Sequence, residues 1–186
     1  RDIGVTGVQT CALPILNYVN SNYMQFSNDY GSNWAFLSTI PGAAINMGDM
    51  AISGDGTTMI ISGANYKTWI TTNSGASWTD ITSTRGLPNT SIYTNANTWA
   101  CCSASKTGQY LCIAGWFNQA GGPYSTGGWA FISQDYGASW TSKSIPLTTP
   151  SADPSFLTSC MSWKDDGTPN RAFFATFSQG IFYLDF

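Results

Sequence analysis

An eight-residue pattern occurs three times in this chain and constrains its fold more than any other feature. Each copy begins with Ser or Thr, has Asp or Asn at its third position and Gly at its fifth, and ends with Trp. A stretch of apolar or alternating residues precedes and follows each copy, which is typical of two strands joined by a turn. The fixed positions of this octad are Ser27, Asp29, Gly31 and Trp34, then Thr71, Asn73, Gly75 and Trp78, and finally Ser133, Asp135, Gly137 and Trp140.

The residue types of the octad suit a hairpin turn. An Asp or Asn side chain accepts hydrogen bonds from backbone N–H groups a few residues further on, and Gly adopts the positive φ that such turns need. Trp can anchor the returning strand in the core. Asn73 replaces Asp in the second copy, which is a mild change because both side chains form the same turn.

The composition favours strands over helices. Charged residues make up 9% of the chain, against roughly 25% in an average soluble domain. All ten acidic residues are Asp, so Glu, the commonest acid of helix surfaces and capping boxes, is absent. With 42% hydrophobic and 15% aromatic residues, the chain has enough apolar surface to fold. We therefore predict an all-β fold with almost no helix.

The octad resembles the Asp-box, or bacterial neuraminidase (BNR) repeat, of sialidases, sortilin-type receptors and photosystem II assembly-factor propellers. This resemblance implies a β-propeller in which each octad is a structural turn between the third and fourth strands of a blade, outside any catalytic centre. The predicted partial propeller covers residues 16–186, with the end of blade A at 16–40, blade B at 45–83, blade C at 96–145 and the start of blade D at 156–186. This amounts to about three to three and a half four-stranded antiparallel blades, whereas closed propellers have about four to eight. We expect missing upstream blades of the same chain, or a homo-oligomer, to complete the ring.

The first fifteen residues, RDIGVTGVQTCALPI, differ in style from the rest of the chain. They resemble a translated sequencing adapter, and we expect them to be an artefact, the alternative being an ordinary leader or first strand. Without Cys11, four cysteines remain, which are Cys101, Cys102, Cys112 and Cys160. An even number is compatible with an oxidising compartment, and four buried free thiols fit equally well.

Composition also excludes several classes of function. The chain has no His, so it cannot form a Ser/His/Asp triad or a His-containing zinc site. A net charge of -3 without a cluster of Lys or Arg argues against nucleic acid as a partner. No run approaches the eighteen or so apolar residues of a membrane span, so we expect no membrane insertion. We predict no metal site and no cofactor, because the pair Asp165-Asp166 fits a strand turn by its chemistry alone.

The predicted strand order places the candidate binding site at one end of the blades. Octads and Gly-Asp-Gly-type turns fall on one face, whereas the loops between second and third strands and the blade connections fall on the other. The insertion at 116–126 in blade C combines aromatic residues with Asn and Gln, which is the composition of a glycan or protein contact surface. Alternatively, its aromatic side chains pack against the neighbouring blade. The candidate ligand-binding residues are Trp116, Phe117, Asn118, Gln119 and Tyr124.

The sequence contains one candidate glycosylation site and one candidate disulfide. Asn89 begins an Asn-Thr-Ser triplet that matches an N-glycosylation acceptor in a predicted loop, although such triplets often arise by chance. Cys101 or Cys102 could lie across a hairpin from Cys112 and form a disulfide. Buried thiols explain the same pattern equally well.

These observations favour a non-catalytic binding module that contacts a glycan or a protein at a cell or virion surface, and hence an extracellular location. The first alternative is a fragment of a sialidase-like glycoside hydrolase. Sialidases resemble one another in using an arginine triad, but after Arg1 only Arg85 and Arg171 remain. The triad cannot be assembled from this chain, and no catalytic residue is assigned. The second alternative is a structural or assembly subunit resembling the photosystem propellers.

Overall fold

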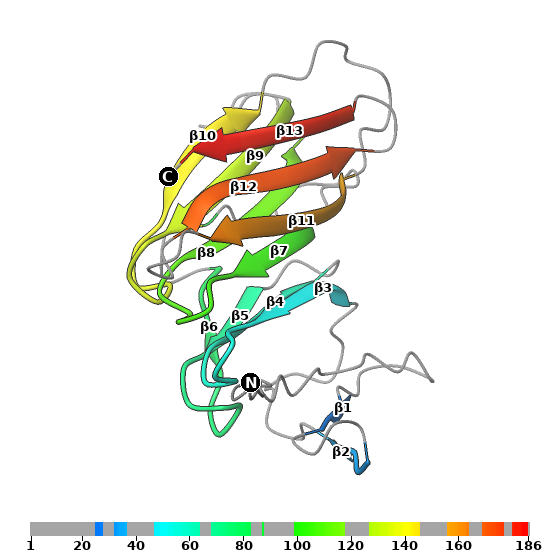
Figure 1. Cartoon of the computed structure of the whole chain (residues 1–186), viewed down its shortest axis with the longest axis vertical. Helices are drawn as coiled ribbons and strands as arrows, with labels where there is room; N and C mark the ends of the chain where they lie inside the picture. Colours follow the sequence, from blue (N-terminus) through cyan, green and yellow to red (C-terminus); the bar gives the residue numbers. More distant parts are fainter. Residues whose placement is uncertain are drawn as a thin grey trace, which may run out of the picture.

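The structure is a computed structural model, which describes residues 25–27, 32–36, 47–63, 68–82, 87, 99–117, 127–145, 156–163, 169–176 and 180–185. All regular elements in these ranges are β-strands, so the predicted all-β fold is confirmed (Figure 1). Residues 1–15, including Cys11, lie outside the described residues, and so do Asp29 and Gly31 of the first octad.

The strands form antiparallel sheets in which neighbours along the chain are neighbours in space. Blades B and C each have four strands, and three strands of blade D and two of blade A are described. Blade A has β1 (Gln25–Phe26) and β2 (Ala35–Phe36), and blade B has β3 (Met47–Ile52), β4 (Met59–Gly63), β5 (Thr68–Thr71) and β6 (Thr79–Asp80). Blade C has β7 (Trp99–Ala104), β8 (Leu111–Phe117), β9 (Gly127–Ser133) and β10 (Thr141–Ile145), and blade D has β11 (Phe156–Trp163), β12 (Pro169–Thr176) and β13 (Gly180–Asp185).

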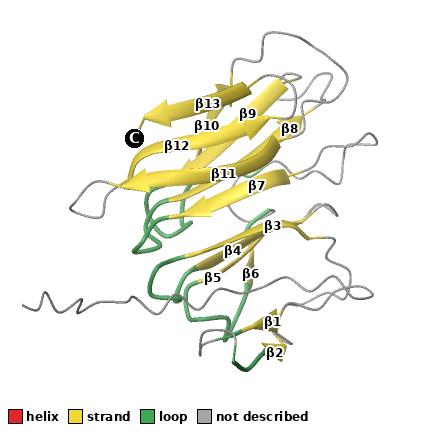
Figure 2. Cartoon of the chain, turned by 45° about the vertical axis from the view of Figure 1, so that its right-hand side comes forward, coloured by secondary structure: helices red, strands yellow, loops and turns green. Residues whose placement is uncertain are grey.

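The sheets are arranged as propeller blades. The first strands β3, β7 and β11 lie side by side in both views, and the later strands of each blade extend away from this inner row (Figures 1 and 2). Sheets that radiate from a row of first strands and stack face to face are the arrangement of a β-propeller.

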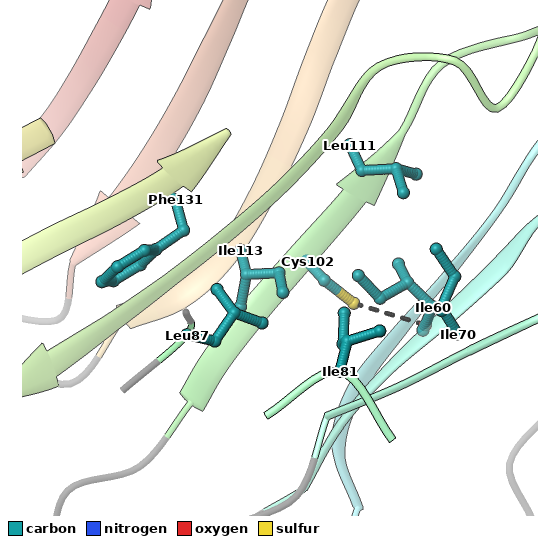
Figure 3. Packing of buried hydrophobic residues seen from close by; sticks show 8 residues of the cluster. All are labelled: Ile60, Ile70, Ile81, Leu87, Cys102, Leu111, Ile113 and Phe131. Carbon is teal, nitrogen blue, oxygen red and sulfur yellow. Dashed lines mark hydrogen bonds between the residues drawn. The ribbon is translucent and has the colours of Figure 1, made fainter. Parts of the chain in front are cut away.

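Apolar side chains fill the space between consecutive blades because successive residues of a strand point to opposite faces of the sheet. In β4, Ile60 faces blade C, whereas Met59 and Ile61 belong to a separate cluster on the other face of blade B, with Trp69 and Trp78. The B–C cluster (Figure 3) consists of Ile60, Ile70, Ile81, Leu87, Cys102, Leu111, Ile113 and Phe131. The C–D cluster consists of Cys101, Cys112, Ala114, Ala130, Ile132, Ile145, Ala172 and Phe174.

Each first strand carries an irregularity at the same place. The register shifts between Met47 and Asp49 in β3, between Trp99 and Cys101 in β7, and between Phe156 and Thr158 in β11. A β-bulge of this kind inserts one unpaired residue and bends the strand locally. These bulges were not predicted from the sequence.

Candidate functional site

The connections between strands divide the described blades into two ends. The turn face carries residues 53–58, 72–78, 105–110 and 134–140, which are short turns. The loop face lies at the opposite end, where β4 leads to β5, β8 leads to β9 and one blade leads to the next. The candidate residues Asn118, Gln119, Tyr124 and Asn89 belong to loop-face connections that lie outside the described residues.

Trp116 and Phe117 lie at the loop-face end of β8, where the structure describes the backbone. Blade C extends beyond blade B at this end, because Gly115 occupies the repeat position of Gly63, the last residue of β4, and β8 continues for two more residues. Trp116 pairs with Gly128 and Phe117 with Gly127 in the register of β8 and β9.

One tryptophan at the same end was not singled out from the sequence. Trp129 lies opposite Gly115, which in turn lies opposite Trp99, so two tryptophan positions flank one glycine. The Trp129 side chain is half-buried and packs against the B–C cluster. Trp129 thus contributes to the core between blades B and C. The alternation of side chains along 127–133 was the signal in the sequence that could have indicated this.

The octad at 133–140 forms a closed network of hydrogen bonds on the turn face. The Ser133 hydroxyl donates to Asp135 Oδ1 at 2.8 Å and accepts the Gly137 N–H at 2.8 Å. Asp135 Oδ1 also accepts the Ser139 N–H at 2.8 Å, and Asp135 Oδ2 accepts the Ser139 hydroxyl at 2.6 Å. The Trp140 indole N–H donates to the Gly137 carbonyl at 3.1 Å. The side chains therefore satisfy the backbone of the turn that carries them.

The octad at 71–78 repeats the side-chain bonds of its first, third and seventh positions with Asn in place of Asp, but the buried Trp78 indole N–H has no hydrogen-bond partner among the described residues, unlike that of Trp140. Thr71 Oγ1 donates to Asn73 Oδ1 at 2.8 Å and accepts the Gly75 N–H at 3.1 Å. Asn73 Oδ1 accepts the Ser77 N–H at 2.9 Å, and the Asn73 amide donates to the Ser77 hydroxyl at 2.8 Å. Asn and Asp thus have equivalent roles in the two turns. In the first octad, Ser27 is buried and Trp34 is half-buried.

The octads at 71–78 and 133–140 are also attached to the first turns of their own blades. The N–H of Ser74 donates to the Thr57 carbonyl at 2.9 Å, and the N–H of Tyr136 donates to the Gln109 carbonyl at 3.0 Å. Ser74 and Tyr136 have φ values of 56° and 57°, an uncommon conformation for residues other than glycine. From the sequence, a positive φ was expected only at Gly75 and Gly137, the glycines that follow Ser74 and Tyr136.

Among the described carboxyl groups, the pKa values of Asp135 and Asp55 on the turn face are lowered, whereas that of Asp49 is raised. Burial is the largest single effect on the pKa of Asp135 and raises it, but the hydrogen bonds from Ser139, Ser133 and Ala138 together outweigh burial and lower the pKa. The pKa of Asp55 is lowered in the same way by Ser53 and Thr57, which outweigh its burial. Burial raises the pKa of Asp49. Asp49 could not be singled out from the sequence, because one Asp in a strand forms no motif.

Cys101, Cys102 and Cys112 are buried free thiols. In the register of β7 and β8 the partner of Cys112 is Ser103, while Cys101 pairs with Ala114 and Cys102 with Ile113. The cross-strand bridge considered from the sequence is therefore not formed, because the ladder does not place two cysteines opposite each other. Burial raises the pKa of Cys102 and of Cys112 well above the ordinary value, and the charge of Asp49 adds to the effect at Cys102.

Within the ranges that the structure describes, no group of three or more His, Cys, Asp or Glu residues could hold a metal ion. Over the same ranges, no helix is long and apolar enough to cross a membrane.

No protein-family model matches the chain, and no curated protein is significantly similar to it in sequence. Solved structures do share its architecture. A GH74 xyloglucanase from Xanthomonas campestris is 19% identical over 86% of this chain and 23% of its own, with a TM-score of 0.59. A GH74 enzyme from Niastella koreensis is 21% identical over 87% of this chain and 20% of its own, with a TM-score of 0.53. YCF48 from Cyanidioschyzon merolae is 15% identical over 76% of this chain and 37% of its own, with a TM-score of 0.52.

The chain therefore spans between about a fifth and two fifths of the length of these three proteins, which matches the 20% and 37% coverage of their chains. At these identities the similarity concerns the fold. Together with the radiating antiparallel sheets, it establishes that this chain has a β-propeller fold.

Proposed function

We propose that this chain is a non-catalytic binding module of the Asp-box propeller type, which contacts a glycan or a protein through its loop face at a cell or virion surface. The observation that carries the proposal is the difference between the two faces. The turn face is made of short turns whose side chains hydrogen-bond to their own backbone. Its polar groups are engaged in holding the fold, so the variable connections of the loop face are the better place for recognition.

Among blades B, C and D, blade C carries the longest connection between its second and third strands. Its residues 118–126 compare with 64–67 in blade B and 177–179 in blade D. The paired extension of β8 and β9 supports this connection and brings Trp116 and Phe117 to its base. Aromatic residues next to Asn and Gln combine a large contact area with adaptable hydrogen bonding, which suits both glycan and protein surfaces.

The assignment of the octads to the Asp-box type rests on their shared chemistry. In both described networks a hydroxyl at the first position and a side-chain carbonyl or carboxylate at the third satisfy N–H groups of the turn. The glycine at the fifth position has a positive φ in both turns, 84° at Gly75 and 78° at Gly137. These roles explain why the residue types recur at fixed spacing.

A sialidase-like hydrolase is less well supported, because the position of Arg171 does not suit a substrate carboxylate on the loop face. Arg171 pairs with Ser162 and Asp185 near the turn-face ends of β11 and β13. Its guanidinium donates to Asp185 at 2.6 Å and stacks on the Tyr183 ring, with 4.3 Å between the guanidinium carbon and the ring centroid. Arg171 is thus already engaged with groups of its own blade.

The proposal is tested by screening the folded chain on a glycan array and against a displayed peptide library. The test variant replaces Asn118, Gln119 and Tyr124 with alanine, and the matched control replaces the exposed turn-face residues Tyr136 and Ser77. We expect binding that falls at least tenfold in the loop-face variant and stays unchanged in the control, with both variants folded by circular dichroism. Binding lost only in the turn-face control, or no binding to either library, would refute the proposal.

A further inference from the structure

A single carboxyl group links the inner strands of blades B and C. Asp49 lies on β3 immediately after the β-bulge, and its Oδ2 accepts the backbone N–H of Cys102 on β7 at 2.8 Å. Its Oδ1 accepts the N–H of Met50 at 2.8 Å. The two oxygens thus have different partners, one in the same strand and one in the next blade.

The strands around Asp49 provide no cation to neutralise it. On its own strand, β3, Asp49 is the one residue with a titratable side chain, and β4 has none, although the Ser62 hydroxyl donates to the Asp49 carbonyl at 3.3 Å. β7 contributes the thiols of Cys101 and Cys102. Cys102 is buried, and its thiol is directed to the Ile60 carbonyl at 3.7 Å (Figure 3). On these strands, the ionised carboxylate of Asp49 is therefore stabilised only by hydrogen bonds from two backbone N–H groups.

The position is occupied differently in the other blades. The residue that follows the bulge is Cys101 in β7 and Thr158 in β11. Cys101 is fully buried in the apolar C–D cluster. The repeat thus places an ionisable carboxyl group at the B–C junction, where the C–D junction has a neutral thiol.

We propose that Asp49 is a proton-responsive link between blades B and C, whose protonation stabilises the junction and whose ionisation weakens it. The physical cause is the partial burial of a charge that has no counter-ion on β3, β4 or β7, which costs free energy that two hydrogen bonds only partly offset. Burial raises the pKa of Asp49 above 3.8, and the hydrogen bonds from Cys102 and Met50 oppose this shift without cancelling it.

The sign of the effect follows from linkage. A carboxyl group whose pKa is higher in the folded chain than in the unfolded chain binds its proton more tightly when folded. Its contribution to stability is complete below the unfolded value and is lost as the pH rises through the folded value. Asp55 has a lowered pKa, so its contribution has the opposite sign, and it serves as the matched control.

The experiment follows Asp49 directly by carboxyl-carbon NMR in the folded chain and compares urea unfolding of wild type, Asp49→Asn and Asp55→Asn from pH 3.5 to pH 7. We expect the Asp49 titration midpoint above 3.8, with the Cys102 amide proton shifting at the same midpoint because it donates to this carboxylate. The folding constant of wild type relative to Asp49→Asn should fall as the pH rises, about tenfold for each unit by which the pKa is raised. Relative to Asp55→Asn it should rise.

Three results would overturn the proposal. The first is an Asp49 midpoint at or below 3.8, and the second is a stability ratio to Asp49→Asn that is flat over the pH range. The third is a Cys102 amide that does not respond when Asp49 titrates, which would show that the carboxyl group does not link the two blades. The NMR titration uses wild-type protein, so the proposal stays testable even if Asp49→Asn does not fold.

Discussion

Replacing Gly137 with alanine tests whether the octad sets the distance between blades B and C. Gly137 has a φ of 78°, and a Cβ built on it would lie 2.5 Å from Ile70 Cδ1 in blade B and 3.4 Å from Leu111 Cδ1 in its own blade. Two constraints therefore act on this residue: its backbone has a left-handed conformation, and the neighbouring blade leaves no room for a side chain. Only glycine meets both without a rearrangement.

The magnitude of the loss can be built from these two constraints. A left-handed conformation costs a residue with a Cβ about 1–2 kcal/mol, and inserting a methyl group into a well-packed core costs typically about 1–3 kcal/mol. We therefore expect Gly137→Ala to lower the free energy of unfolding by about 2–5 kcal/mol, a large part of the roughly 5–15 kcal/mol that stabilises an ordinary domain. Gly56 has the backbone constraint without the steric one, because its φ is 73° but its Cβ would meet only Ile52 Cδ1 at 4.0 Å. Gly56→Ala should lose about 1–2 kcal/mol, the backbone contribution alone.

The assay is urea unfolding followed by tryptophan fluorescence, with Ile70→Val as the compensating change. Valine lacks the Cδ1 atom that the new methyl group would meet, and Ile70→Val alone should cost about 0.5–1.5 kcal/mol. The double variant should therefore be more stable than the sum of the two single losses predicts, by about 1–3 kcal/mol. The reasoning fails if the two losses add, or if Gly137→Ala is no more harmful than Gly56→Ala.

Other parts of the fold give further expectations. Asp135→Ala should cost about 0.5–2 kcal/mol in urea unfolding, as loss of a capping side chain does. Asp135→Asn should cost less, because Asn73 accepts the corresponding Ser77 N–H and still bonds to the Ser77 hydroxyl, as a donor where Asp135 is an acceptor. Since hydrogen bonds lower the pKa of Asp135, its contribution should be lost as the pH falls below 3.8, and a loss at higher pH would contradict this sign. Phe174→Ala, at a fully buried position, should cost about 3–5 kcal/mol in thermal unfolding, and an equal loss for the partly exposed Phe173→Ala would contradict the assignment of strand faces. Cys112 should react with a thiol reagent only after unfolding, and rapid labelling of the native chain, located by mass spectrometry, would show that it is not buried.

The sequence was sufficient to predict the fold class, because the octad contains its own physical explanation. A hydroxyl, a carboxylate or amide, a glycine and a tryptophan at fixed spacing specify a turn and the strands beside it. The same reasoning could not locate the bulge beside Asp49, since a bulge depends on how two strands pair and has no residue type of its own. It also could not decide the state of Cys112, because one register step determines whether a thiol faces another thiol or Ser103. For the loop-face candidates, Trp116 and Phe117 are placed on β8 by their register, and the function assigned to them stays a prediction.

The repeated turns also explain how such a fold can tolerate variation at its other end. On the turn face, the Gly54 N–H donates to the Lys106 carbonyl at 2.8 Å, which joins the first turns of blades B and C. Gly108 lies so close to Thr58 that a Cβ would approach its Oγ1 to 2.4 Å. These contacts hold the first turns of blades B and C together through short segments. Because the blades are positioned from this end, a connection such as 118–126 can lengthen on the loop face without disturbing the sheets, which is the physical basis for placing recognition there.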